Sequence, residues 1–228
     1  MKSLMSADAL PPNLPVFPLT GCILLPGNWL PLHIFEPRYR ALVADSLHCD
    51  KFVGMIQPLV PAADNFGPAP HPEEAPDLYR VGCAGRIEHA LPESDGRYHI
   101  LLKGMRRFEL HGEMPPVKGY RRFQVSYDGF PDDLAEPGRI LDSSRILRAL
   151  QVLRDSHSLS IDPEDFRSLA GVAIINGLSA ALPFAPAEKQ ALLEATGPEE
   201  RERLLLALMT MGFRQGTGTR YAPSSIIH

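Results

Sequence analysis

The chain has 228 residues, of which 44% are hydrophobic, so it is long enough to bury a proper core in one large domain or two small ones. Its formal net charge of -4 gives no overall attraction to nucleic acid or an anionic membrane, so either partner would need a local basic patch. No apolar run approaches the roughly 20 residues of a membrane-spanning helix, and the N-terminus lacks the apolar core of a signal peptide. We therefore expect a cytoplasmic protein with no membrane partner.

The start of the chain predicts a loose lead-in, then short buried strands and a helix. Residues 1–13 form the lead-in, because termini that are not tied into a sheet or core usually stay mobile. Apolar runs at residues 16–19, 22–25 and 30–35, cut by prolines and glycines, predict brief buried strands separated by turns. A helix is expected over about residues 37–47, since proline suits the first helical turn, where an N–H group would have no partner.

A long proline-rich loop interrupts the strand region. Before it, residues 51–57 predict a short buried strand in which Gly54 marks a bulge or a close backbone approach. From Pro58 to Pro76 the chain carries six prolines, which remove backbone donors and cannot sustain a helix or a central strand. Loops of this length in a compact domain are usually functional or disordered, so the segment is either a binding lid or a disordered insertion.

Several further strands are predicted beyond this loop. Residues 79–90 and 97–103 form the two arms of a hairpin, and the Asp-Gly pair at 95–96 tolerates the positive φ of its turn. Residues 107–111 and 122–127 alternate polar and apolar side chains, which indicates strands with one face on a core and the other in water. Many short strands with Gly and Pro punctuation favour a closed or nearly closed barrel.

The composition changes near residue 130, and from there it predicts helices up to residue 212. Apolar residues within 144–153 form a first helical stripe, and a long helix is expected from Pro163 to Leu182. Pro186 and Pro198 are expected to begin two more helices. We therefore divide the chain into the following predicted segments: a flexible N-terminus at 1–13, a β-rich subdomain at 14–130, a helical subdomain at 131–212 and a flexible tail at 213–228.

Several motifs resemble the signature of the Lon protease N-terminal domain family, in its stand-alone form. They begin with Leu14-Pro-Val-Phe-Pro-Leu19 and Leu25-Pro-Gly27, followed by Leu32-His-Ile-Phe-Glu-Pro-Arg-Tyr-Arg40. The resemblance covers about residues 14–211. It implies an α+β fold, with an N-terminal PUA-like β pseudobarrel that includes a short helix, followed by a C-terminal helical bundle.

The resemblance also implies a function. In the full protease this domain is thought to recognise substrate polypeptides, while other domains hydrolyse ATP and cleave peptide bonds. The sequence has no G-x-x-x-x-G-K-[ST] loop to cradle phosphates, and we expect no serine and lysine dyad. The expectation is a non-enzymatic module that needs no cofactor and binds unfolded or exposed polypeptide segments, with homo-oligomerisation left open.

Three aromatic residues are candidates for contacting such a peptide. Trp29, Phe35 and Tyr39 could line an apolar groove between the barrel and the helices, although such side chains are more often core. Trp29 stands apart because Asn28 and Pro31 place it in a turn, where a large apolar side chain has a reason to be partly exposed.

An RNA-binding protein is the alternative. Basic residues concentrate in the later strands, and aligned strands would gather them into a patch for phosphate groups. The opposing interpretation is a solvated barrel face. The candidates are Arg106, Arg107, Arg121 and Arg122.

A small-molecule-binding protein or enzyme is the third hypothesis, but no residue constellation supports it. Cys83 could pair with His89 or His99 as a thiol and base, yet nothing in the sequence supplies a third, orienting group. The His-Cys-Asp run at 48–50 has ligand-like residue types, but adjacent side chains point apart and no second cluster completes a zinc site. The three cysteines include no C-x-x-C pair, which is typical of reduced, buried thiols. We therefore predict no catalytic residue and no metal site.

Overall fold

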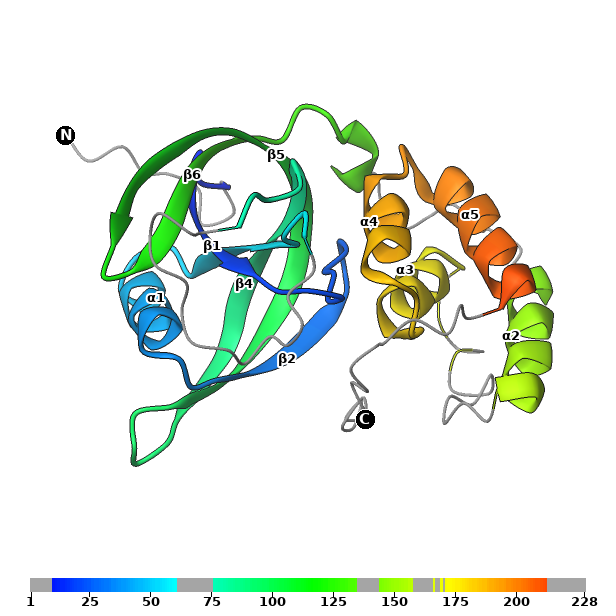
Figure 1. The fold of residues 1–228 in the computed structure, drawn as a ribbon, viewed down its shortest axis with the longest axis horizontal. Helices are drawn as coiled ribbons and strands as arrows, with labels where there is room; N and C mark the ends of the chain where they lie inside the picture. Colours follow the sequence, from blue (N-terminus) through cyan, green and yellow to red (C-terminus); the bar gives the residue numbers. More distant parts are fainter. Residues whose placement is uncertain are drawn as a thin grey trace.

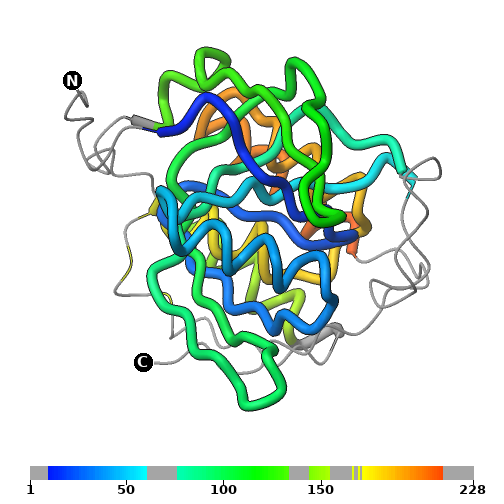
Figure 2. Tube along the Cα trace, turned by 90° about the vertical axis from the view of Figure 1, so that its left-hand side faces the viewer, coloured from blue at the N-terminus to red at the C-terminus, as the bar shows by residue number. Residues whose placement is uncertain are grey.

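The computed structural model describes residues 10–60, 76–134, 144–157, 166, 169 and 171–212. A β-rich part comes first in the chain and a helical part follows (Figure 1). Figure 2 looks along the long axis and shows the β-rich part in front of the helices, which run from yellow to orange. The predicted α+β class is confirmed. The loop between Pro58 and Pro76 and the tail lie largely or wholly outside the described residues, so both predictions stay open.

Six strands build one sheet that closes on itself. The strands are β1 (Asn13–Pro18), β2 (Trp29–Ile34), β3 (Phe52–Ile56), β4 (Val81–Pro92), β5 (Tyr98–Val117) and β6 (Tyr120–Ser126). Their order is β2-β5-β4-β3-β1-β6, and an additional pairing of β5 with β6 closes five of them into a barrel. The β2 strand lies outside this ring and pairs only with β5 among the described strands. It is therefore an edge strand.

The length of β5 makes this closure possible. The sequence predicts separate strands at 97–103 and 107–111, but the structure has one strand from Tyr98 to Val117. Its first part pairs with β2 and β4, and its last part turns to β6 through two register shifts. Such irregularities bend a strand, which lets one strand serve two sides of a barrel. The hairpin turn before it has Gly96 at φ 80°, as predicted.

Glycines allow the barrel wall to close over a central phenylalanine. A Cβ on Gly54 would lie 3.0 Å from Cζ of Phe108, and one on Gly82 would lie 2.5 Å from the same atom. The Phe108 side chain is fully buried. The predicted close approach at Gly54 is therefore confirmed, and its cause is the ring of Phe108, which lies on β5 directly opposite Gly82 of β4.

The chain before β2 differs from the prediction at two places. Residues 10–13 are not loose, because Val125 N–H donates to the carbonyl of Pro12 and the Tyr127 hydroxyl donates to that of Pro11. Residues 23–25 are buried and Cys22 is partly buried, but residues 22–25 form no strand. A turn at Pro26 and Gly27 follows these residues. In this turn the N–H of Gly27 donates to the carbonyl of Gly104.

The helix α1 (Pro37–Leu47) begins and ends where predicted and lies on the side of the barrel away from the other helices (Figure 1). Pro37 occupies its first turn, and Leu42 and Val43 are completely buried in the barrel core. Asp45 on its exposed side accepts hydrogen bonds from Lys118 and Tyr120, which join α1 to the turn between β5 and β6.

The helical part contains a short 3-10 helix, η2 (Pro131–Leu134), and the helices α2 (Ser144–His157), α3 (Gly171–Ala181), α4 (Pro186–Glu194) and α5 (Pro198–Met211). The α4 and α5 helices start with proline as predicted. The long helix expected from Pro163 is shorter, since Phe166 lies in a 3-10 turn and α3 begins at Gly171; Pro163 itself lies outside the described residues. Apolar residues of all four α-helices share a core that includes Ile146, Leu178, Leu192 and Leu205. None of the described helices is both long and apolar enough to cross a membrane.

The β-rich and helical parts meet along buried polar contacts, which we call the seam. Gln57 Nε2, at the end of β3, donates to Oε1 of Gln190 on α4 at 3.1 Å, and Gln190 donates to the carbonyl of Val81 on β4 at 3.0 Å. Asn28 donates to the carbonyl of Asn176 on α3 at 2.9 Å, and Asn176 returns a hydrogen bond to the carbonyl of Pro26. The two parts are thus fastened together by side-chain amides.

Candidate functional site

One sheet face of the barrel carries side chains that are not covered by the core or the helices. Directly opposite residues of antiparallel strands share a face, and side chains alternate along each strand. The odd-numbered positions of β2 and β5 therefore point outward, while Leu30, Leu32 and Ile34 pack against the core. We call this surface the β2 face, and it consists of Trp29, Pro31 and His33 on β2, His99, Leu101 and Lys103 on β5, and His89 and Leu91 on β4.

Two large apolar side chains are exposed on the β2 face. Trp29 is 52% exposed and Leu91 is 68% exposed. The Lys103 ammonium lies 5.6 Å from the centre of the Trp29 ring, within the range of a cation–π contact, so a charge on the neighbouring strand holds the indole on the surface. Exposure of Trp29 agrees with its sequence context, although the residue begins a strand rather than lying within a turn.

The β2 face ends at a sheet edge that is not paired within the described part of the chain. No described strand pairs with the second edge of β2, which is the last strand in the sheet order. An unpaired edge presents backbone N–H and C=O groups that can accept a further strand. Pro31 removes one donor from the middle of β2, and prolines at edges limit unwanted pairing. The site therefore combines an apolar surface with a backbone edge.

The other two predicted peptide contacts have different environments. Phe35 is half-buried beyond the end of β2, with its ring 6.1 Å from that of His33. Tyr39 is 5% exposed, because it points from α1 into the barrel core with its ring 4.1 Å from that of Phe17. Burial raises the pKa of Tyr39 to about 12. The prediction that Tyr39 contacts a peptide is therefore corrected: it is a core residue.

Arg107 does not belong to a basic surface patch, contrary to the prediction. Its side chain is 1% exposed and forms a two-armed ion pair with Asp133 of η2, in which Nη2 lies 2.7 Å from Oδ1. Its Nη1 also donates to the carbonyls of Leu193 and Ala195 at the end of α4. Arg107 thus joins the barrel to the helical part and cannot reach a phosphate group of a nucleic acid. The reason is strand alternation, which turns Arg107 toward the helices.

The remaining arginines of that set are engaged with protein groups. Arg121 pairs with Glu113 at 2.7 Å and donates to the carbonyl of Pro76. Arg122 donates to the carbonyl of Pro115 at 3.2 Å. Arg106 lies 6.0 Å from the centre of the Tyr127 ring. No structural observation on these residues favours nucleic acid.

The predicted apolar groove between the barrel and the helices stays a prediction, because the described seam contacts of Gln57 and Asn28 are hydrogen bonds and do not test it.

The prediction that all three cysteines are buried is corrected by the structure. Of the three cysteines, Cys83 alone is completely buried, Cys22 is partly buried and Cys49 is exposed. Burial is the largest cause that raises the pKa of Cys83, followed by the Asp133 carboxylate, so this thiol is not an activated nucleophile.

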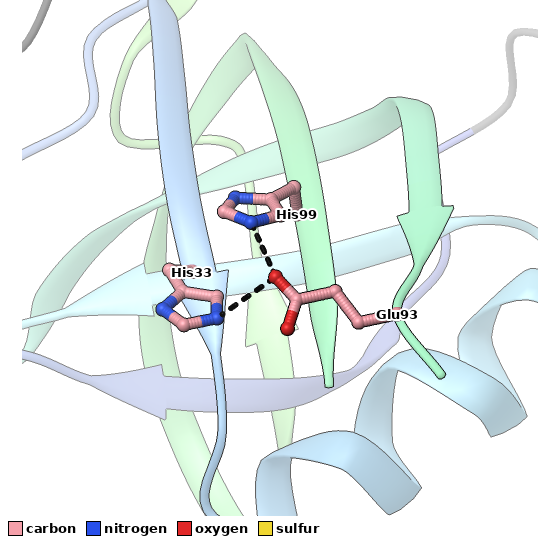
Figure 3. A group of neighbouring side chains, drawn as sticks. All are labelled: His33, Glu93 and His99. Atoms are coloured by element: carbon pink, nitrogen blue, oxygen red, sulfur yellow. Dashed lines mark ion pairs between the residues drawn. The ribbon is translucent and has the colours of Figure 1, made fainter. Parts of the chain in front are cut away.

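The structure also brings together three residues that the sequence does not predict as a site. His33, Glu93 and His99 lie side by side where β2 meets the β4–β5 hairpin (Figure 3). His33 and His99 face each other across two strands, a pairing that local sequence patterns do not specify. In the sequence, the position of Glu93 and His99 on either side of the predicted turn is the signal that could have indicated that these two residues lie close together.

The structure is therefore a barrel-and-helix domain, in which the seam joins a closed barrel to a helical part and an apolar face is exposed beside the edge strand β2. A family model described as the ATP-dependent protease La (LON) substrate-binding domain matches residues 13–211. The chain therefore belongs to this family, in agreement with the motifs at residues 14–40.

Several bacterial Lon proteases are similar in sequence to this chain. The Lon protease of Flavobacterium johnsoniae is 25% identical over 219 residues, which cover 91% of this chain and 25% of that protein. The Lon protease of Anaeromyxobacter dehalogenans is 26% identical over 210 residues, which cover 90% of this chain and 24% of that protein. The chain thus spans about a quarter of the length of these relatives.

Two solved structures have the same fold. A Lon N-terminal domain protein from Xanthomonas campestris is 28% identical with a TM-score of 0.57, and the match covers 86% of this chain and 98% of that one. The N-terminal domain of the Mycobacterium avium complex Lon protease is 17% identical with a TM-score of 0.56, covering 87% of this chain and 98% of that one. The second likeness shows the fold alone.

Proposed function

We propose that the protein is a non-enzymatic polypeptide-binding module that holds extended, partly apolar segments of other proteins against the β2 face. Membership of the substrate-binding domain family supports polypeptides as the class of ligand. The single observation that best supports this site is Trp29, a large apolar side chain that is 52% exposed on β2, the last strand in the described sheet order.

The geometry suits an extended segment that lies along β2. The backbone edge supplies hydrogen bonds that do not depend on the ligand's sequence, as in other domains that add a strand to a sheet. Trp29 and Leu91 supply apolar contact area, and Lys103 beside the indole favours segments that carry a carboxylate. Such a site selects exposed, unfolded segments because folded proteins rarely present a free extended strand with apolar side chains.

The first test uses the fact that Trp29 is the single tryptophan of the chain. Addition of a permanently unfolded, reduced and alkylated protein without tryptophan should shift the indole emission to shorter wavelength, because the ligand removes water from the ring. An unchanged emission spectrum at saturating ligand would place any binding elsewhere.

Substitution Trp29→Ala gives the quantitative test. A central tryptophan in an interface commonly contributes about 2 kcal/mol or more, so the affinity for a labelled unfolded peptide, measured by fluorescence anisotropy, should fall about 30-fold. Met211→Ala is the matched control, since Met211 is 64% exposed on α5 and lies outside the β2 face. Equal losses in both variants, or no loss in Trp29→Ala with an unchanged circular dichroism spectrum, would refute the site.

A further inference from the structure

We propose that His33, Glu93 and His99 form a binding site for a divalent transition-metal ion of the zinc class. The donor atoms of the three side chains lie within 4.8 Å of one another. Both histidines direct Nε2 at the same oxygen of Glu93, at 3.4 Å for His33 and 2.6 Å for His99 (Figure 3). The observations behind this inference do not depend on the proposed peptide binding, although His33 and His99 also belong to the β2 face.

The backbone fixes where the three ligands lie. His33 and His99 are directly opposite each other in the β2–β5 pair, a position in which Cβ atoms lie about 4.5–5.5 Å apart. Glu93 lies in the hairpin turn, where its N–H donates to the carbonyl of Arg97 and its carbonyl accepts from Gly96. Two strands and a turn thus hold the three side chains on one surface.

A positive charge lies behind the carboxylate of Glu93. Nε of Arg97 lies 3.0 Å from Oε2 of Glu93 and 2.6 Å from Oδ2 of Asp95, while Oε1 of Glu93 is the oxygen that faces the two histidines. Ligating carboxylates in metal sites are commonly held in this way by a group behind them. Arg97 therefore balances part of the negative charge of Glu93 and Asp95 together, and it leaves Oε1 of Glu93 facing the histidines.

The residue types select the class of ion. Imidazole nitrogens suit zinc, copper and nickel, whereas magnesium and calcium prefer sets of oxygen ligands. Two histidines and one glutamate supply three ligands, and the exposed position lets water complete a tetrahedral shell.

Binding requires a local rearrangement that the exposed side chains permit. Ligand atoms around one tetrahedral zinc ion lie about 3.3 Å apart, so the short contact between His99 and Glu93 must open slightly as the ion replaces the proton between them. The two rings are stacked with centroids 4.5 Å apart and 11° between their planes. Because an ion lies in the plane of each ligating ring, one ring must turn about its Cβ–Cγ bond. The side chains of His33 and His99 are 39% and 58% exposed, which leaves room for this turn.

The test is isothermal titration of the tag-free 228-residue chain with zinc chloride. Loss of a residue that only hydrogen-bonds to a metal ligand already lowers metal affinity about 10–100-fold. Loss of a ligand itself, in His33→Ala or His99→Ala, should therefore lower the affinity for zinc at least tenfold. The matched control is His111→Ala, an exposed histidine on the same strand as His99 that lies outside the cluster. It should leave the affinity unchanged.

The affinities of the three variants for zinc are compared with that of the natural chain. Because His33 and His99 are exposed, their substitution should not unfold the protein, and circular dichroism of each variant checks this. Absence of zinc binding by the natural chain would overturn the proposal. Unchanged affinity in either His33→Ala or His99→Ala would also overturn it, because the ion would then be held by other residues.

Discussion

At the scale of single residues, Arg107 of β5 joins the barrel to two elements of the helical part, η2 and α4. Its guanidinium pairs with Asp133 and its Nη1 donates to two carbonyls at the end of α4. The side chains of Arg107 and Asp133 are 1% and 5% exposed, so each charge depends on the other for compensation. Burial, followed by the neighbouring Arg107 charge, also lowers the pKa of Arg201 to about 10. Asp133 therefore balances a strongly positive interior.

Substitution Asp133→Asn should be severely destabilising. It keeps the shape of the side chain but leaves the buried Arg107 charge without its partner, a change that typically costs about 3–5 kcal/mol. The free energy of unfolding from urea titration would measure the loss. Asp132→Asn, an exposed neighbour on the same 3-10 helix, is the control and should change stability by less than about 0.5 kcal/mol. Equal unfolding midpoints for the two variants would show that Arg107 does not need the carboxylate.

At the scale of elements, Asp45 attaches α1 to the β5–β6 turn. Its Oδ1 accepts from Lys118 at 2.6 Å and its Oδ2 accepts from the Tyr120 hydroxyl at 3.0 Å. The hydrogen bond from Lys118 is the main cause that lowers the pKa of Asp45 below its ordinary value of 3.8, and Tyr120 adds to the effect. A carboxyl group with a lowered pKa stabilises the fold where it is ionised, above its unfolded-state pKa, and loses that contribution as the pH falls through its folded-state pKa.

Because the pKa of Asp45 is lowered in the folded state, the effect of Asp45→Asn on stability should depend on pH. At pH 7 the variant should be less stable than the natural chain by about 1 kcal/mol, a modest value because the ion pair is partly exposed to solvent. The difference should stay constant down to about pH 5 and shrink below about pH 4, as Asp45 becomes protonated. Urea unfolding at a series of pH values measures it. A difference that grows toward low pH would contradict the assignment of the charge.

Elements with local signals are those that the sequence predicts well. The helices that begin at Pro37, Pro186 and Pro198 follow from the proline itself and the apolar spacing after it, and Gly96 follows from an Asp-Gly pair. The continuous β5 strand cannot be predicted from a local signal, because the bulges within it depend on partners in β4 and β6.

Sites that depend on distant partners are missed for the same reason. Arg107 has the composition of a surface charge, and only Asp133, 26 residues away, and Leu193, 86 residues away, make it an interior residue. Of the candidate site, Trp29 could be predicted because its neighbours are turn residues. Leu91, Lys103 and the histidine pair reach the same face through sheet register, which no short motif encodes.

At the scale of the whole molecule, the seam determines whether the barrel and the helices behave as one unit. Gln57, Gln190 and the Val81 carbonyl form a buried chain of hydrogen bonds between β3, α4 and β4. Leu193 of α4 also packs within the barrel core. Separation of the two parts would leave these amides and the Arg107 charge without partners, and each unsatisfied buried polar group costs about 1–3 kcal/mol. Neither part is therefore expected to stay folded when the other unfolds.

The resulting prediction is a single cooperative unfolding transition, although a chain of this length often unfolds in steps. Scanning calorimetry should give equal calorimetric and van't Hoff enthalpies. Slowly exchanging amides in β4 and in α5 should report the same free energy of opening. Gln190→Ala should lower the melting temperature of the whole transition without splitting it, because the substitution removes partners on both sides of the seam. A separate early transition of the helices would show instead that the seam is weaker than the internal packing of each part.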